Sequence, residues 1–328
     1  MKKITALLLA LFMLVGALAG CGKQNDTNQT DKLSIVTTIF PEYDWVREIL
    51  GEKADNAEIT MLLDNGVDLH SYQPTADDIV KISDCDLFIY VGGESDEWVE
   101  DALRNAANGN MKVINLLEVL GDSVKTEEIV EGMQEEEHEY EDAEEHEHEE
   151  EADEHVWLSL KNAKMLVRVI SKALQELDPD NKDIYAANAD AYVKKLSALD
   201  AEYQTAMDAA SNKTILFGDR FPFRYLVDDY GLRYYAAFVG CSAETEAGFE
   251  TISFLAKRVD EWKLPCVLTI EGARHKIAET IVRNTTAKNQ RVLTMDSMQS
   301  TTSKDVKNGT TYLSVMEKNL SVLKEALR

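Results

Sequence analysis

The chain has 328 residues with 60 acidic and 34 basic side chains, so its formal net charge is -26. This charge argues against nucleic acid or an anionic membrane surface as a binding partner, because both require a basic face. Seventeen of the acidic residues lie between positions 126 and 155, so much of the charge is local. The length exceeds what one ordinary core needs and predicts two lobes.

The N-terminus has the pattern of an export signal. Two lysines precede an apolar stretch that ends in Leu18-Ala19-Gly20-Cys21. The stretch is shorter than the roughly 20 residues that a spanning helix needs. Its end resembles the lipobox of bacterial lipoproteins, which implies that Cys21 is acylated. We therefore expect a signal peptide at 1–20, a polar lipid-anchored linker at 21–32, and a cell-membrane location facing the extracytoplasmic side.

The first half of the chain alternates apolar runs of strand length with helical patterns. This alternation predicts an α/β lobe with a mainly parallel sheet at 33–178. A disordered acidic loop is expected within it at 126–154. The expected strands are 33–38, 58–63, 86–91 and 111–117, with helices at 41–50, 75–83 and 96–107.

A long helical pattern at 179–210 separates the two halves, and no Gly or Pro follows Pro179 within it. Such a helix would be a stiff connection between two lobes. The second half, 211–328, repeats the alternation and predicts a second β/α lobe. Its expected strands are 214–217, 234–239, 266–270 and 292–295, with helices at 222–230, 246–263, 275–286 and 311–327.

Three polar residues occupy positions where ligands bind in such folds. His70 follows the second expected strand, His155 stands where the acidic run ends, and Asp296 follows the last strand. Ligands of open α/β sheets bind outside the carboxyl ends of the strands, so the three residues predict a metal site in the cleft between the lobes. Each also has an ordinary interpretation, as a hydrogen-bonded structural histidine or as a helix cap.

An ordered series of motifs resembles the zinc/manganese solute-binding lipoproteins of ABC importers, the ZnuA-like family. The resemblance covers the whole mature chain. It implies two lobes joined by a rigid helix and one metal held by His70, His155, a further His or Glu, and Asp296. The motifs are Gly66-x-x-x-His70-x-Tyr72-x-Pro74, His155-Val156-Trp157-Leu158-Ser159, Leu177-Asp178-Pro179, Asp229-Tyr230-Gly231 and Leu293-Thr294-Met295-Asp296-Ser297.

The sequence departs from the family at the third ligand. We place that position on Gly218, which has no side chain to donate. Asp219, Glu271 and His275 are the candidate replacements. Each has a structural alternative: an ion pair for Asp219, a helix cap for Glu271 and a solvent-exposed ring for His275. Alternatively, the site has three protein ligands and a water molecule.

The expected metal is zinc rather than manganese, because imidazole suits zinc and carboxylate-dominated sites suit manganese. His138, His146 and His148 lie in the acidic loop. They resemble the metal-collecting tracts of zinc-type family members, so we expect auxiliary, weak metal binding there and no cleft ligand. The ordinary interpretation is a solvated charge run.

The cysteines have no spacing typical of a metal site. Cys85 lies beside an apolar run and reads as a buried small hydrophobe. Cys241 and Cys266 stand near the ends of expected strands. Outside the cytoplasm the three cysteines that remain allow one disulfide, and these positions favour Cys241 with Cys266.

Together these observations predict a monomeric carrier that captures a divalent metal, zinc ahead of manganese, and delivers it to an ABC permease. No P-loop motif is present, so ATP hydrolysis belongs to another component. One alternative is a solute-binding lipoprotein for an organic ligand, which would need an apolar pocket. A surface zinc hydrolase is a further alternative, although the chain lacks the H-E-x-x-H spacing of such enzymes, and we expect no enzymatic activity.

Overall fold

The computed structural model describes residues 32–134, 151–242, 246–272 and 275–328, and Leu33–Arg328 form one compact unit. Its first sheet is entirely parallel, with strand order β2-β1-β3-β4. The central strands carry the near-continuous apolar sequences that are typical of strands covered on both faces. The strands are β1 (Leu33–Thr37), β2 (Ala57–Met61), β3 (Leu87–Tyr90) and β4 (Lys112–Asn115).

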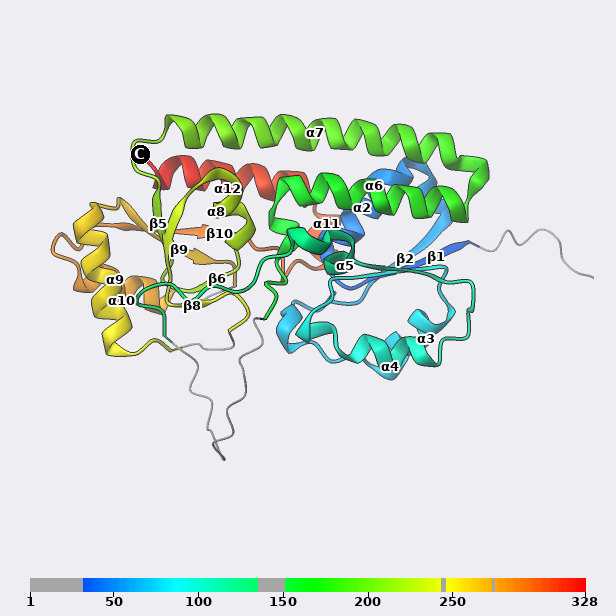
Figure 1. The fold of residues 1–328 in the computed structure, drawn as a ribbon, viewed down its shortest axis with the longest axis horizontal. Coiled ribbons are helices and arrows are strands. Elements are labelled where there is room, and N and C mark those ends of the chain that lie inside the picture. The colour runs from blue at the N-terminus through cyan, green and yellow to red at the C-terminus, as the bar shows by residue number, and fades with distance from the viewer. Residues whose placement is uncertain (1–31, 135–150, 243–245, 273–274) are drawn as a thin grey trace, which may run out of the picture. The chain divides into compact units, whose positions relative to one another are not determined.

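Helices cover both faces of this sheet, as the expected βαβ alternation requires (Figure 1). Helix α2 (Phe40–Leu50) lies on one face, while α3 (Ala76–Asp84) and α4 (Trp98–Arg104) lie on the other. The last strand ends earlier than expected. Asn115 accepts a hydrogen bond from the Glu118 N–H and caps a short helix, α5 (Leu116–Leu120), where a strand was expected.

Helix α6 (Leu160–Leu177) is absent from the elements expected from the sequence. The Ser159 side chain caps it by accepting the Asn162 N–H. Its apolar residues repeat at helical spacing, so the signal was present in the sequence and was missed. The buried members of that repeat are Leu160, Ala163, Leu166, Val167, Ile170 and Leu174.

The long helix α7 (Lys182–Ala209) has 28 residues, or about 42 Å at 1.5 Å per residue. It begins after a separate 3-10 turn, η6 (Pro179–Asn181). It packs against α2 and α6 of the first lobe and against α8 (Arg224–Tyr230) and α12 (Tyr312–Ala326) of the second (Figure 1). The expected long connecting helix is therefore confirmed.

Beyond α7, the described strands form three two-stranded parallel sheets. A bridge between Phe217 and Leu268 links two of them. The single strand expected at 234–239 is divided in two, and β6 was not expected. The pairs are β5 (Thr214–Leu216) with β7 (Arg233–Tyr235), β6 (Arg220–Phe221) with β8 (Phe238–Val239), and β9 (Cys266–Ile270) with β10 (Arg291–Met295).

The remaining helices are α9 (Phe249–Trp262) and α10 (Lys276–Asn284), which pack on each other, and the short α11 (Ser303–Lys307). The α/β class with parallel sheets and a long helix is confirmed. Over the described ranges, we find no helix with both the length and the apolar character that crossing a bilayer requires.

The acidic segment is ordered at both ends. Thr126 and Ala152 form an antiparallel bridge, and the Asp153 N–H donates to the Lys125 carbonyl. The stretches 126–134 and 151–154, expected to be disordered, are therefore structured, because backbone pairing joins the two ends of the segment. His138, His146 and His148 lie outside the described residues, as do Cys21 and residues 1–20, the expected signal peptide.

Candidate metal centre

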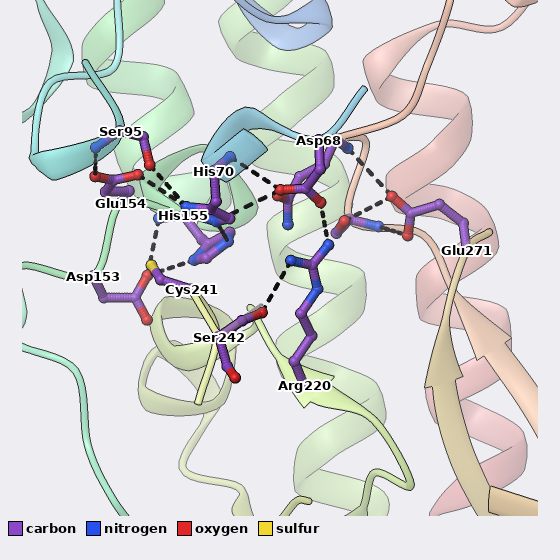
Figure 2. Close-up of polar contacts among 12 residues, drawn as sticks. Asp68, His70, Ser95, Asp153, Glu154, His155, Arg220, Cys241, Ser242 and Glu271 are labelled. Atoms are coloured by element: carbon purple, nitrogen blue, oxygen red, sulfur yellow. Dashed lines mark hydrogen bonds and ion pairs between the residues drawn. The ribbon is translucent and has the colours of Figure 1, made fainter. Parts of the chain in front are cut away.

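Two histidines from distant segments meet at one point. His70 lies in the 3-10 turn η2 (Leu69–Ser71) after β2, and His155 directly precedes η5 (Val156–Leu158). Their Nε2 atoms are 3.2 Å apart (Figure 2). Tetrahedral zinc holds two imidazole nitrogens about 3.3 Å apart, given Zn–N bonds of about 2.05 Å. The pair therefore has the spacing of two ligands of one ion.

Side-chain oxygen atoms contact the Nδ1 atom of each ring. His70 Nδ1 lies 2.8 Å from Ser95 Oγ and 3.4 Å from Glu154 Oε2. His155 Nδ1 lies 3.0 Å from Asp153 Oδ1, which also accepts the His155 N–H. This arrangement turns the Nε2 edge of each ring toward the other. In metal sites, oxygen groups placed in this way hold the hydrogen on Nδ1 and leave Nε2 to bind the metal.

The carboxylate of Glu154 reaches this position because of Gly93. A Cβ at Gly93 would lie 2.4 Å from Glu154 Oε1, and Gly93 has a φ of +84°. Glu154 Oε1 accepts the Ser95 N–H at 2.8 Å. Burial by itself would raise the pKa of Glu154, but hydrogen bonds from His70 and Ser95 hold this pKa below its usual value. Glu154 is therefore an anion beside His70.

An ion pair between the two lobes lies beside His70. Arg220 in β6 contacts Asp68, whose Oδ1 also accepts the His70 N–H (Figure 2). Burial would raise the pKa of Asp68, yet Arg220 and His70 lower it. The Gln299 amide lies between Asp68 and His155. With its nitrogen toward Asp68, its oxygen lies 3.1 Å from His155 Nε2.

Cys241 is the third donor at this point. One donor atom from each of His70, His155 and Cys241 lies within 4.8 Å of the other two, and this is the one such cluster among the described histidines, cysteines and carboxylates. Burial raises the pKa of the Cys241 thiol, and the nearby Glu127, Asp153 and Glu154 raise it further. Sequence reasoning missed this residue. Its one signal was its place near the end of an apolar strand.

Asp296 directly follows β10 and lies outside the donor cluster of the described residues. Its Oδ1 accepts the Met298 N–H at 2.8 Å, and burial raises its pKa. Glu271 accepts hydrogen bonds from Ser297 and from the Gln299 N–H, and burial together with Asp296 raises the pKa of Glu271 to about 7. Neither carboxylate belongs to the donor cluster around His70 within the described ranges.

The other two candidates also have their own partners. His275 Nδ1 lies 2.7 Å from Thr269 Oγ1, and Asp219 accepts the N–H groups of Arg220 and Ile270. A Cβ at Gly218 would lie 2.5 Å from the Ala278 Cα, so this position faces α10. Arg220, two residues later, contacts Asp68, whose Oδ1 accepts the His70 N–H.

The disulfide considered from the sequence is not formed. Cys241 and Cys266 are both free, as is Cys85. Cys266 opens β9 in register with Arg291, whereas the turn after β8 holds Cys241, whose N–H donates to Glu127. The expectation failed because the end of an expected strand does not determine which neighbouring segment the side chain meets. The expected burial of Cys85 is confirmed.

Comparison with known proteins identifies the family. The family profile described as "ZnuA: Zinc-uptake complex component A periplasmic" matches residues 35–326. The chain belongs to this family. It is 33% identical over 325 residues to the zinc-binding lipoprotein AdcA of Streptococcus pneumoniae serotype 4, a match that covers 99% of this chain and 61% of that protein. It is 32% identical to the high-affinity zinc uptake system protein ZnuA of Bacillus subtilis, covering 97% and 95% of the two chains.

Solved structures agree with this assignment. The Zn(II)-bound ZnuA-like domain of S. pneumoniae AdcA matches with a TM-score of 0.69 and 30% identity, over 90% of this chain and 99% of that one. The metal-dependent lipoprotein YcdH of B. subtilis matches with a TM-score of 0.72 and 26% identity, over 90% and 99%. The resemblance and the fold expected from the sequence are thus confirmed.

Proposed function

We propose that this chain is the substrate-binding protein of an ABC importer, and that it binds one divalent transition metal, zinc in preference to manganese, at His70 and His155. The observation that carries the proposal is the facing pair of Nε2 atoms, 3.2 Å apart, with both Nδ1 atoms held by oxygen groups. Imidazole nitrogens favour zinc. The zinc-related names of relatives that match nearly the whole chain support the same cargo.

Asp296 is the carboxylate that we propose as a further ligand. Its Oδ1 already accepts the Met298 N–H, so a metal would compete with that hydrogen bond. We propose Asp296 ahead of Asp219, Glu271 and His275, because the family resemblance implies a ligand at Asp296. The other three also have hydrogen-bond partners of their own. We retain the proposal that His138, His146 and His148 bind metal weakly and raise its local concentration.

We also propose a delivery step, which membership of the family supports. We propose that residues 1–20 are a cleaved signal peptide, that Cys21 carries the lipid, and that 21–32 tether the lobes 33–178 and 211–328 outside the membrane, with 179–210 between them. The loaded protein would then dock as a monomer on the permease. Two relatives are named lipoproteins or zinc-uptake proteins, which supports this location.

An organic solute is the rival cargo, and cavity size disfavours it. Pockets for such ligands enclose about 300–1,000 Å³. The cavity beside the histidine pair, which reaches from Glu127 to Gly240, has about 10 Å³. A larger one of about 580 Å³ lies between the ends of α7 and α12 and includes none of the candidate ligands. We also propose that the chain is a carrier and not a hydrolase.

Calorimetric titration of zinc and manganese tests this proposal. The protein is residues 22–328 with His138, His146 and His148 replaced by Ala, so that loop imidazoles do not contribute. We expect one tightly bound zinc and weaker manganese. His70→Ala and His155→Ala should each weaken zinc binding by about 100-fold or more, since loss of an outer partner already costs 10–100-fold.

His275→Ala is the matched control, because this ring is held by Thr269 outside the cluster. It should bind zinc like the parent. Unchanged zinc affinity in both His70→Ala and His155→Ala would contradict the proposed site. A parent protein that binds neither metal would favour an organic cargo.

A further inference from the structure

We infer that Cys241 is the third protein ligand of the metal and binds it as a thiolate through Sγ. This inference rests on the proposed function. It places the ligand that the sequence analysis sought near Gly218 in the turn after β8, at Cys241. The supporting observation is the cluster itself, in which one donor atom each of His70, His155 and Cys241 lies within 4.8 Å of the others.

The cluster is close to the dimensions of a zinc site. Tetrahedral zinc with Zn–N of about 2.05 Å and Zn–S of about 2.3 Å places nitrogen and sulfur about 3.6 Å apart. The two imidazole nitrogens already have ligand spacing, at 3.2 Å. One nitrogen of each ring lies within 4.8 Å of the sulfur, at most about 1.2 Å beyond the nitrogen–sulfur distance of such a zinc site.

The backbone before Cys241 is built to lie against His155. A Cβ at Gly240 would be 3.0 Å from both His155 Cε1 and the Phe221 carbonyl oxygen, a separation that real Cβ atoms rarely show. The absent side chain lets the turn after β8 approach the buried imidazole. Glu127 then holds the turn, because its Oε1 accepts the Cys241 N–H at 3.0 Å.

Competing donors from the second lobe are engaged elsewhere. Arg220 is a cation paired with Asp68, and a guanidinium cannot bind a metal ion. Glu271 accepts hydrogen bonds from the loop after β10. Cys241 is a free thiol. Within the described residues it is thus the second-lobe side chain that the structure groups with the two histidines.

When the metal binds, the Cys241 thiol releases one proton. The Sγ–H bond breaks, an Sγ–Zn bond forms, and the proton leaves to solvent, since thiolate is the form that binds metals. An N₂S set with a soft sulfur favours zinc over manganese, which prefers oxygen ligands. Cys241 would also connect the metal to the second lobe, because both histidines belong to the first.

Cobalt(II) substitution gives a direct readout, because thiolate–cobalt bonds produce an intense charge-transfer band in the near ultraviolet. The parent is residues 22–328 with the three loop histidines replaced by Ala, kept reduced. It should show this band at one equivalent of cobalt. Cys241→Ser should lack the band and bind zinc about 100-fold more weakly or worse, as judged by competition with a chromophoric chelator.

Cys266→Ser is the matched control, since it replaces another free cysteine outside the cluster. It should keep both the band and the zinc affinity. If the parent binds one cobalt without a thiolate band, and Cys241→Ser binds zinc like the parent, the inference is wrong while the proposed function stands. If the parent binds neither metal, both fail.

A measurement on unsubstituted cysteines covers the case in which Cys241→Ser does not fold. Alkylation of the parent is followed by mass spectrometry with and without one equivalent of zinc. Zinc should slow modification of Cys241 at least tenfold relative to Cys85. Equal rates for Cys241 with and without bound zinc would overturn the inference.

Discussion

His70 and His155 are 85 residues apart in the sequence, yet their Nε2 atoms lie 3.2 Å apart. Each ring is fixed by an oxygen group at Nδ1, so neither depends on the other for its orientation. The site is thus preorganised by packing around the two rings. On the second-lobe side, Arg220 lies on β6 and Cys241 lies two residues after β8, the strand that pairs with β6.

Asp153→Asn should weaken zinc binding by about 10–100-fold. The carboxylate accepts both the His155 N–H and, at 3.0 Å, the Nδ1 hydrogen. An amide retains one acceptor but loses the charge that makes the imidazole a stronger ligand. Chelator competition measures the change. The control is Asp190→Asn, which removes a surface partner of Arg168 and should leave zinc affinity intact.

Arg220→Gln should tighten zinc binding several-fold while lowering the stability of the metal-free protein. The guanidinium is a positive charge paired with Asp68, whose Oδ1 lies 4.0 Å from His70 Nε2. Its removal eliminates repulsion toward the incoming cation and also leaves Asp68 without its partner. The gain should shrink at high ionic strength. Titration at two salt concentrations measures it, with Arg168→Gln as control, and a weaker or unchanged affinity would contradict the prediction.

Trp157→Phe should lower the free energy of unfolding by about 1–3 kcal/mol more than the matched Trp45→Phe. Both indoles are fully buried. Trp157 Nε1 donates to the Ser297 carbonyl at 2.8 Å, whereas Trp45 Nε1 has no hydrogen-bond partner in the described part of the chain. The difference therefore isolates the bond that holds the loop after Asp296. Urea denaturation measures both variants, and equal losses would assign the effect to ring volume alone.

Asp44→Asn should raise the melting temperature at pH 8 and have little effect at pH 4. Burial raises the pKa of Asp44 to about 7 in the folded protein, against about 3.9 when unfolded. Folding thus favours the protonated form, and this contribution to stability is full below about pH 4 and is lost as the pH rises through about 7. The amide keeps an acceptor for the Tyr312 N–H, which Asp44 binds at 2.9 Å.

Thermal unfolding between pH 4 and pH 8 measures the Asp44 effect. The exposed Asp190→Asn serves as control and should change the melting temperature equally at both values. A stabilisation by Asp44→Asn that does not grow with pH would show that charge burial is not its cause.

The sequence by itself determined the α/β class, the long connecting helix and the positions of both histidines. Strand and helix patterns are local, so apolar spacing is readable without knowing which segments meet. The helical spacing of apolar residues was also present for α6, although we did not predict that helix. The strand pattern was weak for β6, which has two residues. Short strands carry too few alternating positions to be recognised.

Only the tertiary structure decided what surrounds the histidine pair. Gly218 faces α10, Arg220 reaches Asp68, and Cys241 lies beside His155 and not beside Cys266. Each outcome depends on tertiary packing, within the second lobe for Gly218 and between the lobes for Arg220 and Cys241. A side chain two residues further along an irregular strand end contacts a different neighbour. Residue types at strand ends therefore predicted a metal site in this region. The donor set depends on contacts between segments that are distant in the sequence, and local patterns do not reveal those contacts.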